Sequence, residues 1–169
     1  MDHPILTNRQ LRAIQDMKLG ESRTKTIDVT FDYGLGLSGM RETIDRVCDE
    51  AESAVDSGYS LIVLTDRSVS KETPTVSMLM ASSAVHQHLI RRTKRSRIGL
   101  IVETGEACEV HHHCLLLGYG VDAINPYLAF EALWQARRDC KLPQSLDSDE
   151  AVVEAYRLAV SKGLSLIHI

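Results

Sequence analysis

Residues 103–114, ETGEACEVHHHC, combine three residue types that bind metal ions. Three consecutive histidines lie between Cys108 and Cys114, and glutamates precede them. Thiolate, imidazole and carboxylate groups are the ligands of protein-bound zinc, and they also carry protons in acid–base catalysis. The composition of this segment therefore raises the hypothesis of a small metalloenzyme.

The spacing of these residues argues against a metal site. Successive residues of a helix are rotated by about 100°, so three consecutive histidines point in different directions and do not chelate one ion. The best helical pair is Cys108 with His112, whereas His113 shares a face with Glu109. No HExxH motif and no second cluster supply further zinc ligands. The core-facing residues of the helix are expected to be Ala107, Val110, Cys114 and Leu117. We therefore predict no catalytic, cofactor-binding or metal-binding residue in this chain.

Three other motifs each have a chemical and a structural interpretation. RRTKRSR (91–97) is basic but has no interleaved aromatic residue to stack on bases, which favours a solvated turn over a nucleic-acid site. YGLGLSG (33–39) has the G-x-G-x-x-G spacing of a dinucleotide-binding loop, and Asp66 lies roughly where a ribose ligand would be expected. The preceding strand is short and polar, which favours an ordinary loop. Serines precede His86, but no GxSxG motif marks one of them as a nucleophile.

The composition limits the class of protein. The chain has 169 residues, of which 44% are hydrophobic and 25% charged, and its formal net charge is −4. These values are typical of one soluble domain or a piece of a larger protein, and the mild acidity argues against a nucleic-acid partner. No apolar run approaches the roughly 20 residues of a membrane span, and the N-terminus lacks a secretory pattern. The four cysteines form no CxxC pairs, which favours reduced thiols and a cytoplasmic location.

Beyond residue 25 the pattern alternates between strands and amphipathic helices. Strands are expected at 26–30, 60–65, 97–102 and 121–125, and helices at 7–17, 38–58, 74–92, 106–120, 126–138 and 146–163. Ser38 and Thr73 are expected to cap helices, Pro74 to occupy a first turn and Gly58 to end a helix. Successive β-α units indicate an α/β fold with parallel strands. An open doubly wound sheet and an incomplete TIM-barrel-like domain both fit this pattern.

Polar residues follow three of these strands. Asp66 and Arg67, Glu103 and Thr104, and Asn125 each lie where a strand ends. Ligands of parallel α/β folds bind at the carboxyl ends of the strands. One hypothesis is therefore a stand-alone small enzyme that binds a metal or phosphate there, and another is a pure interaction module.

The same loops resemble a known family. The segments that carry the resemblance are HPIL (3–6), TIDRVCDEAESAVDSGYSLIVLTDR (43–67), SSAVHQHLIRR (82–92), IGLIVETGEACEVHH (98–112), LLLGYGVDAINPYLAFEAL (115–133) and AYRLAVSKG (155–163). Through them the chain is similar to the central domain of the large subunit of glutamate synthase, in the form closer to the pyridine-nucleotide-dependent bacterial type.

The resemblance implies a role inside a larger enzyme. Such a synthase makes two glutamates from glutamine and 2-oxoglutarate, using reducing equivalents. A glutaminase domain releases ammonia, and an FMN domain that also carries an iron–sulfur cluster uses it; NAD(P)H acts through a partner subunit or domain, such as a small reductase subunit. The central domain resembles an incomplete barrel, binds no flavin, and helps to wall the ammonia route between the two. The resemblance thus implies a fragment of an oxidoreductase that is not competent alone.

We expect Glu103, Thr104, Glu106 and Asn125 to make interdomain or channel contacts at the strand ends. The expected organisation is an N-terminal arm or linker (1–25), the α/β domain (26–163) and a non-native tail, LSLIHI (164–169). The sequence departs from the family at Cys108, where arginine is common, at His113, where an aromatic or other apolar residue is common, and at Ser82, where glycine is usual.

Overall fold

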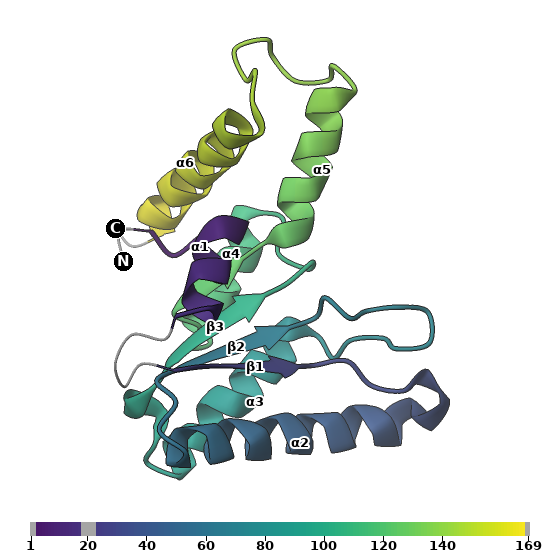
Figure 1. Ribbon diagram of the computed structural model, residues 1–169, viewed down its shortest axis with the longest axis vertical. Coiled ribbons are helices and arrows are strands. Elements are labelled where there is room, and N and C mark those ends of the chain that lie inside the picture. The colour runs from purple at the N-terminus through teal and green to yellow at the C-terminus, as the bar shows by residue number, and fades with distance from the viewer. Residues whose placement is uncertain (1–2, 18–22, 168–169) are drawn as a thin grey trace.

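A computed structural model of the chain describes residues 3–17 and 23–167 (Figure 1). Its centre is a sheet of four strands in the order β1-β2-β3-β4, and every neighbouring pair is parallel. The strands are β1 (Thr24–Asp28), β2 (Leu61–Thr65), β3 (Gly99–Glu103) and β4 (Ala123–Asn125). The sheet is open, which confirms the predicted α/β class and is consistent with a partial barrel.

Helices connect and follow the strands. They are α1 (Asn8–Gln15), α2 (Gly36–Asp56), α3 (Met78–Arg91), α4 (Val110–Gly118), α5 (Tyr127–Arg138) and α6 (Asp149–Ile167), with short 3₁₀ turns η1 (Tyr33–Leu35) and η2 (Arg95–Arg97). None of the helices in the described part of the chain is both long and apolar enough to cross a membrane.

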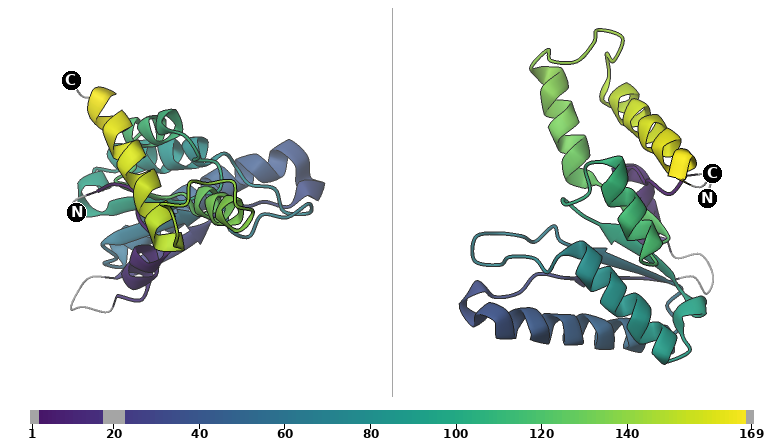
Figure 2. Two further views of the ribbon diagram at one scale, coloured as in Figure 1. Left: turned by 90° about the horizontal axis from the view of Figure 1, so that it is seen from above. Right: turned by 180° about the vertical axis from the view of Figure 1, so that it is seen from behind.

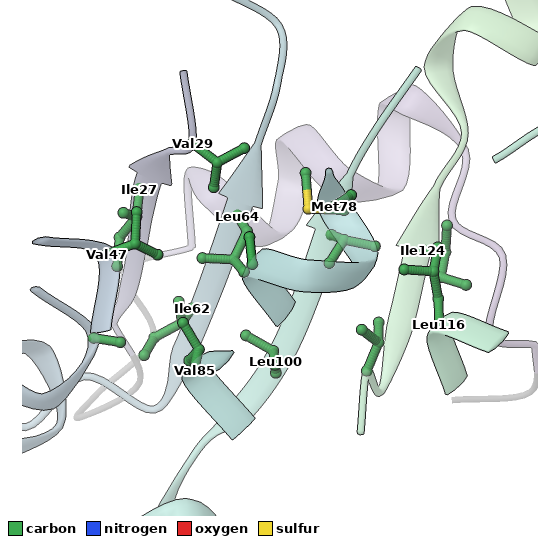
Figure 3. Close-up of a cluster of buried hydrophobic side chains, with 14 of the residues drawn as sticks. Ile27, Val29, Val47, Ile62, Leu64, Met78, Val85, Leu100, Leu116 and Ile124 are labelled. Carbon is green, nitrogen blue, oxygen red and sulfur yellow. The ribbon is translucent and has the colours of Figure 1, made fainter. Parts of the chain in front are cut away.

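The larger core lies on the sheet face that α2 and α3 cover (Figures 1 and 2). Side chains alternate along each strand, so Ile62 and Leu64 of β2 point to this face together with Leu100 of β3. Figure 3 shows these residues packed against Val47 of α2 and Val85 of α3. Because the opposite face of β2 is also covered, consecutive residues of this strand are apolar.

The opposite face carries a smaller core under α1. Val63, Ile101 and Ala123 lie beneath Leu6 and Leu11, and all five are at most 2% exposed. Helix α1 begins with a capping box, in which Thr7 and Gln10 satisfy each other's backbone N–H groups at 3.2 and 2.9 Å.

The N-terminal segment extends the sheet. Ile5 forms a parallel bridge with Ile124 of β4, and the backbone of Ile124 bonds to Pro4 and Leu6 at 2.8 and 2.7 Å. Arg157 of α6 donates to the Ile5 carbonyl at 3.1 Å, so the segment lies between β4 and α6. Residues predicted as an arm therefore contribute to the core, although residues 1–2 and 18–22 lie outside the described residues.

Helix α3 begins at Met78 rather than at Pro74, so the predicted cap at Thr73 was wrong. The reason is tertiary pairing: the Pro74 carbonyl accepts from the Phe31 amide at 2.9 Å, and the Val76 amide donates to Val29 at 3.0 Å. These bonds hold residues 74–76 extended beside the chain that leaves β1.

Gly58 ends α2 with φ +79°, as predicted, whereas Ser38 lies inside α2 and donates to the Leu35 carbonyl at 2.7 Å.

Helix α6 continues to Ile167, and Leu164 is 7% exposed. The first residues of the predicted tail are thus helical, and residues 168–169 lie outside the described residues.

Candidate functional site

A row of polar residues crosses the carboxyl end of the sheet. The strand register pairs Asp28 with Thr65, Thr65 with Glu103, and Glu103 with Asn125. Alternation along the strands places this row on the face that carries α1, one step beyond the smaller apolar core. In a closed barrel this face would line the interior. The row is the best candidate for a functional surface because all four strands contribute one residue to it.

Glu103 is held by two donors from the neighbouring strand. The Thr65 hydroxyl donates to its Oε2 at 2.7 Å, and Arg67 Nε donates to its Oε1 at 2.6 Å. The guanidinium of Arg67 also stacks on the Tyr127 ring at 4.1 Å and reaches Glu131 at 3.4 Å. Burial tends to lower the pKa of Arg67, but the two carboxylates outweigh burial and raise it. The Glu103 carboxylate is therefore ion-paired, and the residue is 8% exposed.

Asp66 shapes the loop after β3. Its carboxylate accepts from the Thr104 hydroxyl at 2.6 Å and from the Gly105 amide at 3.0 Å. Asp66 is 2% exposed and Thr104 is fully buried. Burial, together with the adjacent Asp66 charge, raises the pKa of Tyr127 well above its usual value. Asp66 therefore organises the turn from within the domain.

Asn125 retains one buried acceptor. Its Nδ2 donates to the Leu6 carbonyl and to Asn8 Oδ1, both at 2.9 Å, which fixes the orientation of the amide. Its Oδ1 is buried and has no partner among the described residues. A buried acceptor normally finds a donor, so this oxygen is suited to a polar molecule or group from outside the chain.

Glu106 points elsewhere. Its Oε2 accepts from the Met78 amide at 2.9 Å and from the Ser77 hydroxyl at 3.1 Å, at the start of α3. This carboxylate satisfies helix N–H groups that lack partners within the helix. Of the four predicted residues, the structure brings Glu103, Thr104 and Asn125 together at adjacent strand ends and turns Glu106 toward α3.

Sequence reasoning missed Thr65 and Asp28 in the row, and it named Arg67 without its partners. Hydrogen bonds from Ser68 and Thr30 lower the pKa of Asp28 against the opposing effect of burial. The signal was present in the sequence, because Asp28 and Thr65 occupy the same strand-end position as Glu103. This shared position can be recognised only when the register of all four strands is known.

A groove opens beside this row. It has a volume of about 700 Å³ and lies between α1, α5 and α6. Phe130, Trp134 and Val153 give it apolar lining, and Asn8 and Arg67 connect it to the polar row. The strand ends therefore open onto a hollow bounded by the N-terminal and C-terminal helices.

The histidine cluster forms no metal site within residues 3–17 and 23–167, where no three His, Cys, Asp or Glu residues are suitably grouped. His112 Nδ1 instead accepts from the Cys108 amide at 3.2 Å, before the start of α4. His111 is exposed and His113 is fully buried. The predicted packing face was therefore partly right: Ala107 is buried, and Cys114 and Leu117 pack half-buried against the core, but the buried residues of α4 are His113 and Leu116.

The cysteines do not fit an iron–sulfur cluster, which requires several thiolates around one centre. They are all free and lie on separate parts of the fold: Cys48 is buried in α2, Cys114 is half-buried in α4, and Cys108 and Cys140 are exposed. Burial raises the pKa of the Cys48 thiol to about 11, so this group is an unreactive core residue.

The other motifs have structural roles. The G-x-G-x-x-G run begins beyond the end of β1 rather than directly after it, and Asp66 is bonded to Thr104, so the two parts of the dinucleotide hypothesis do not form one site. In the basic segment 91–97, Lys94 pairs with Glu52 and Asp56 at 2.8 Å, and Arg95 pairs with Asp122 at 2.9 Å. These pairs join the turn after α3 to α2 and to the residue that precedes β4, so much of the segment has a structural role.

Comparison with known proteins gives a consistent result. The glutamate synthase central domain family matches residues 1–168. A glutamate synthase [NADH] of Schizosaccharomyces pombe is 39% identical over 97% of this chain, and one of Saccharomyces cerevisiae is 37% identical over 95%. The glutamate synthase [NADPH] large chain of Bacillus subtilis is 37% identical over 95%. The chain spans only 8% of the two yeast relatives and 10% of the bacterial one.

Proposed function

The chain belongs to the glutamate synthase central domain family, and from this membership we propose that it joins the ammonia-releasing and ammonia-using parts of a larger synthase. In this proposal the parent polypeptide forms two glutamates from glutamine and 2-oxoglutarate. The strand ends of the central domain wall the route along which ammonia travels between a glutaminase domain and an FMN domain. The parent is an oxidoreductase, and this chain supplies a surface rather than a reacting group.

One observation carries the proposal: the carboxylates at the strand ends have partners within the domain. Glu103 is bonded to Thr65 and Arg67, and Asp66 is bonded to Thr104. Ammonia is a nucleophile only while it is neutral, and an unpaired carboxylate in the wall would favour ammonium by attracting its positive charge. A wall whose carboxylates are already ion-paired or hydrogen-bonded, together with the unpaired Asn125 oxygen, offers ammonia a hydrogen-bond acceptor without favouring ammonium.

The cofactors belong to other parts of the parent in this proposal. FMN and an iron–sulfur cluster are held outside this chain, and NAD(P)H acts through a partner subunit or domain. The dispersed cysteines support this division. Their free state also supports a cytoplasmic location.

The test measures coupling in the full-length polypeptide that carries this chain. Glu103→Gln removes the charge beside Arg67, and Asn125→Leu removes the buried acceptor. We expect both variants to hydrolyse glutamine while forming less glutamate per glutamine consumed, because the altered wall lets ammonia escape. Loop exchanges at Thr104 and Glu106 test the two remaining interdomain residues in the same assay.

The control is Glu42→Gln, since Glu42 is exposed on α2. This variant should keep the parent ratio of glutamate formed to glutamine consumed. Thermal unfolding close to that of the parent shows that each variant is folded, and retained glutaminase activity shows that ammonia is still released. Full coupling in both strand-end variants would contradict the proposed channel role.

A further inference from the structure

The G-x-G-x-x-G segment exposes an unusual concentration of apolar side chains. Tyr33, Leu35 and Leu37 are 71%, 52% and 78% exposed. The other large exposed apolar residues of the described part are Val69, Met80, Ile90, Tyr119, Leu128 and Leu158, which are spread along the chain. Single exposed apolar residues are normal on protein surfaces, but a local group of them marks an interaction site.

The segment is also held in a fixed shape. Asp32 Oδ1 accepts from the Gly34 amide at 2.8 Å, and the Tyr33 amide donates to the Glu72 carbonyl at 2.9 Å. Gly36 has φ +54°, a conformation that glycine adopts readily, and it redirects the chain into α2. A Cβ on Gly39 would lie 2.7 Å from that of Leu35, so this position requires glycine. The two glycines therefore permit this shape, and the hydrogen bonds at Asp32 and Tyr33 hold it, so that the apolar side chains are presented outward.

Rigid presentation favours binding, because little conformational entropy remains to be lost when a partner is met. Tyrosine is one of the residue types that dominate the energy of interfaces. Leu37 also borders a surface hollow of about 360 Å³ whose other lining residues are Ser38, Arg41, Glu42 and Asp45. An apolar centre with a polar margin is the usual composition of a protein interface.

The position of the segment indicates its partner. It lies at the outer end of α2, on the side of the molecule away from both chain ends (Figures 1 and 2). The relatives that this chain matches are about ten times longer, since it spans 8% to 10% of them. A protein of this family thus presents extensive surface from other domains of the same polypeptide, and each copy of the polypeptide carries this surface with it.

We propose that residues 32–38 form a docking loop that inserts Tyr33, Leu35 and Leu37 into an apolar hollow on another domain of the same polypeptide. The proposal uses the family membership but does not depend on the ammonia route. It assigns the glycine-rich motif to interdomain docking rather than to nucleotide binding.

Photochemical cross-linking in the full-length polypeptide tests this docking. The photoreactive residue p-benzoylphenylalanine replaces Leu37, whose exposure means that the fold tolerates the change. The matched control carries the same residue in place of Ser53, which is exposed on the same helix. After irradiation and digestion, mass spectrometry identifies the peptides joined to position 37.

The expected product joins position 37 to a peptide outside residues 1–169 of the same polypeptide, in severalfold higher yield than the control. Three results would overturn the proposal: a product that joins two polypeptides, a product confined to residues 1–169, and a yield no higher than that at position 53. Cross-linking reports on contact alone, so its outcome is independent of glutamine and glutamate coupling. A failure of docking and a failure of the channel role are therefore distinguishable.

Discussion

At the scale of single residues, His113 illustrates how a polar group is accommodated in the core. It is fully buried, and its Nε2 lies 2.7 Å from the Tyr156 hydroxyl. That hydroxyl donates to the Cys108 carbonyl at 3.0 Å, so the proton between the two rings belongs to His113 Nε2. Nδ1 is buried without a partner among the described residues. Burial accordingly lowers the pKa of His113 to about 4, and the neighbouring His112 and His3 act in the same direction.

This environment predicts a pH dependence of stability. In the unfolded chain His113 binds a proton as pH falls through its ordinary value of 6.5, whereas in the folded chain it remains neutral down to about 4. The unfolded state therefore gains protons first, and stability is lost as pH falls from 6.5 toward 4. The expected loss between pH 7 and pH 4.5 is about 2 kcal/mol, because 1.36 kcal/mol per pH unit acts only over the interval in which the unfolded chain alone is protonated. Urea unfolding of the chain at pH 7 and pH 4.5 measures it.

His113→Phe keeps an aromatic ring against Tyr156 but removes the titrating group, so it should lose much less stability on acidification. His111→Phe is the control, because His111 is exposed on the same helix and should leave the pH dependence unchanged. Equal pH dependence in the parent chain and His113→Phe would show that another group dominates acid unfolding.

At the scale of elements, the turns that follow helices divide into two kinds. Gly58 after α2 and Gly120 after α4 both have positive φ, at +79° and +96°. Nothing lies within 4 Å of a Cβ on Gly58, whereas a Cβ on Gly120 would overlap the ring of His86. His86 in turn accepts from Arg95, which also bonds to the Gly120 carbonyl and to Asp122. Gly58 is therefore required only for its positive φ, whereas Gly120 is required both for its positive φ and because a side chain there would overlap His86.

Alanine at each position should separate these two costs. Gly58→Ala should lower the free energy of unfolding by about 1–2 kcal/mol, the cost of a left-handed non-glycine residue. Gly120→Ala should lose roughly 1–3 kcal/mol more, because the side chain of His86 must move. Thermal unfolding of the two variants measures the difference. His86→Ala in the Gly120→Ala background should recover part of the additional loss, and no recovery would contradict the steric explanation.

Local sequence patterns were sufficient to predict the positions of most helices and strands. All four strands and all six helices were predicted near their observed positions, because each has its own period and is bounded by turn residues. The start of α3 was not predicted correctly, because residues 74–76 pair with residues 29–31, which are distant in sequence. The packing face of α4 was predicted only in part, because the burial of His113 was missed: residues 104–109 form a loop held by Asp66 and shorten the helix, and Tyr156 of α6 provides a partner for His113. Local patterns carry no information about either contact.

At the scale of the whole molecule, the sheet is covered unequally. Helices α2 and α3 lie along one face, but α1 is the helix that covers the opposite face, where the polar row opens toward the groove (Figure 2). Strand positions were enough to locate Glu103 and Asn125 at one edge of the sheet. Their partners Arg67, Leu6 and Asn8 come from other segments, so the electrostatics of the candidate site required the tertiary structure.

The N-terminal segment is therefore expected to be a structural part of the domain. Leu11 is 2% exposed and packs together with Leu6 over Val63, Ile101 and Ala123. Leu11→Ala should lower the free energy of unfolding by about 2–5 kcal/mol, because it removes buried apolar contacts and leaves a cavity. Arg12→Ala, at an exposed neighbouring position of α1, should change it by less than about 0.5 kcal/mol. Urea unfolding monitored by circular dichroism distinguishes the two cases. If Leu11→Ala proved as mild as Arg12→Ala, residues 3–17 would behave as a separable arm, and the strand-end face would have to obtain its cover from another domain of the parent polypeptide.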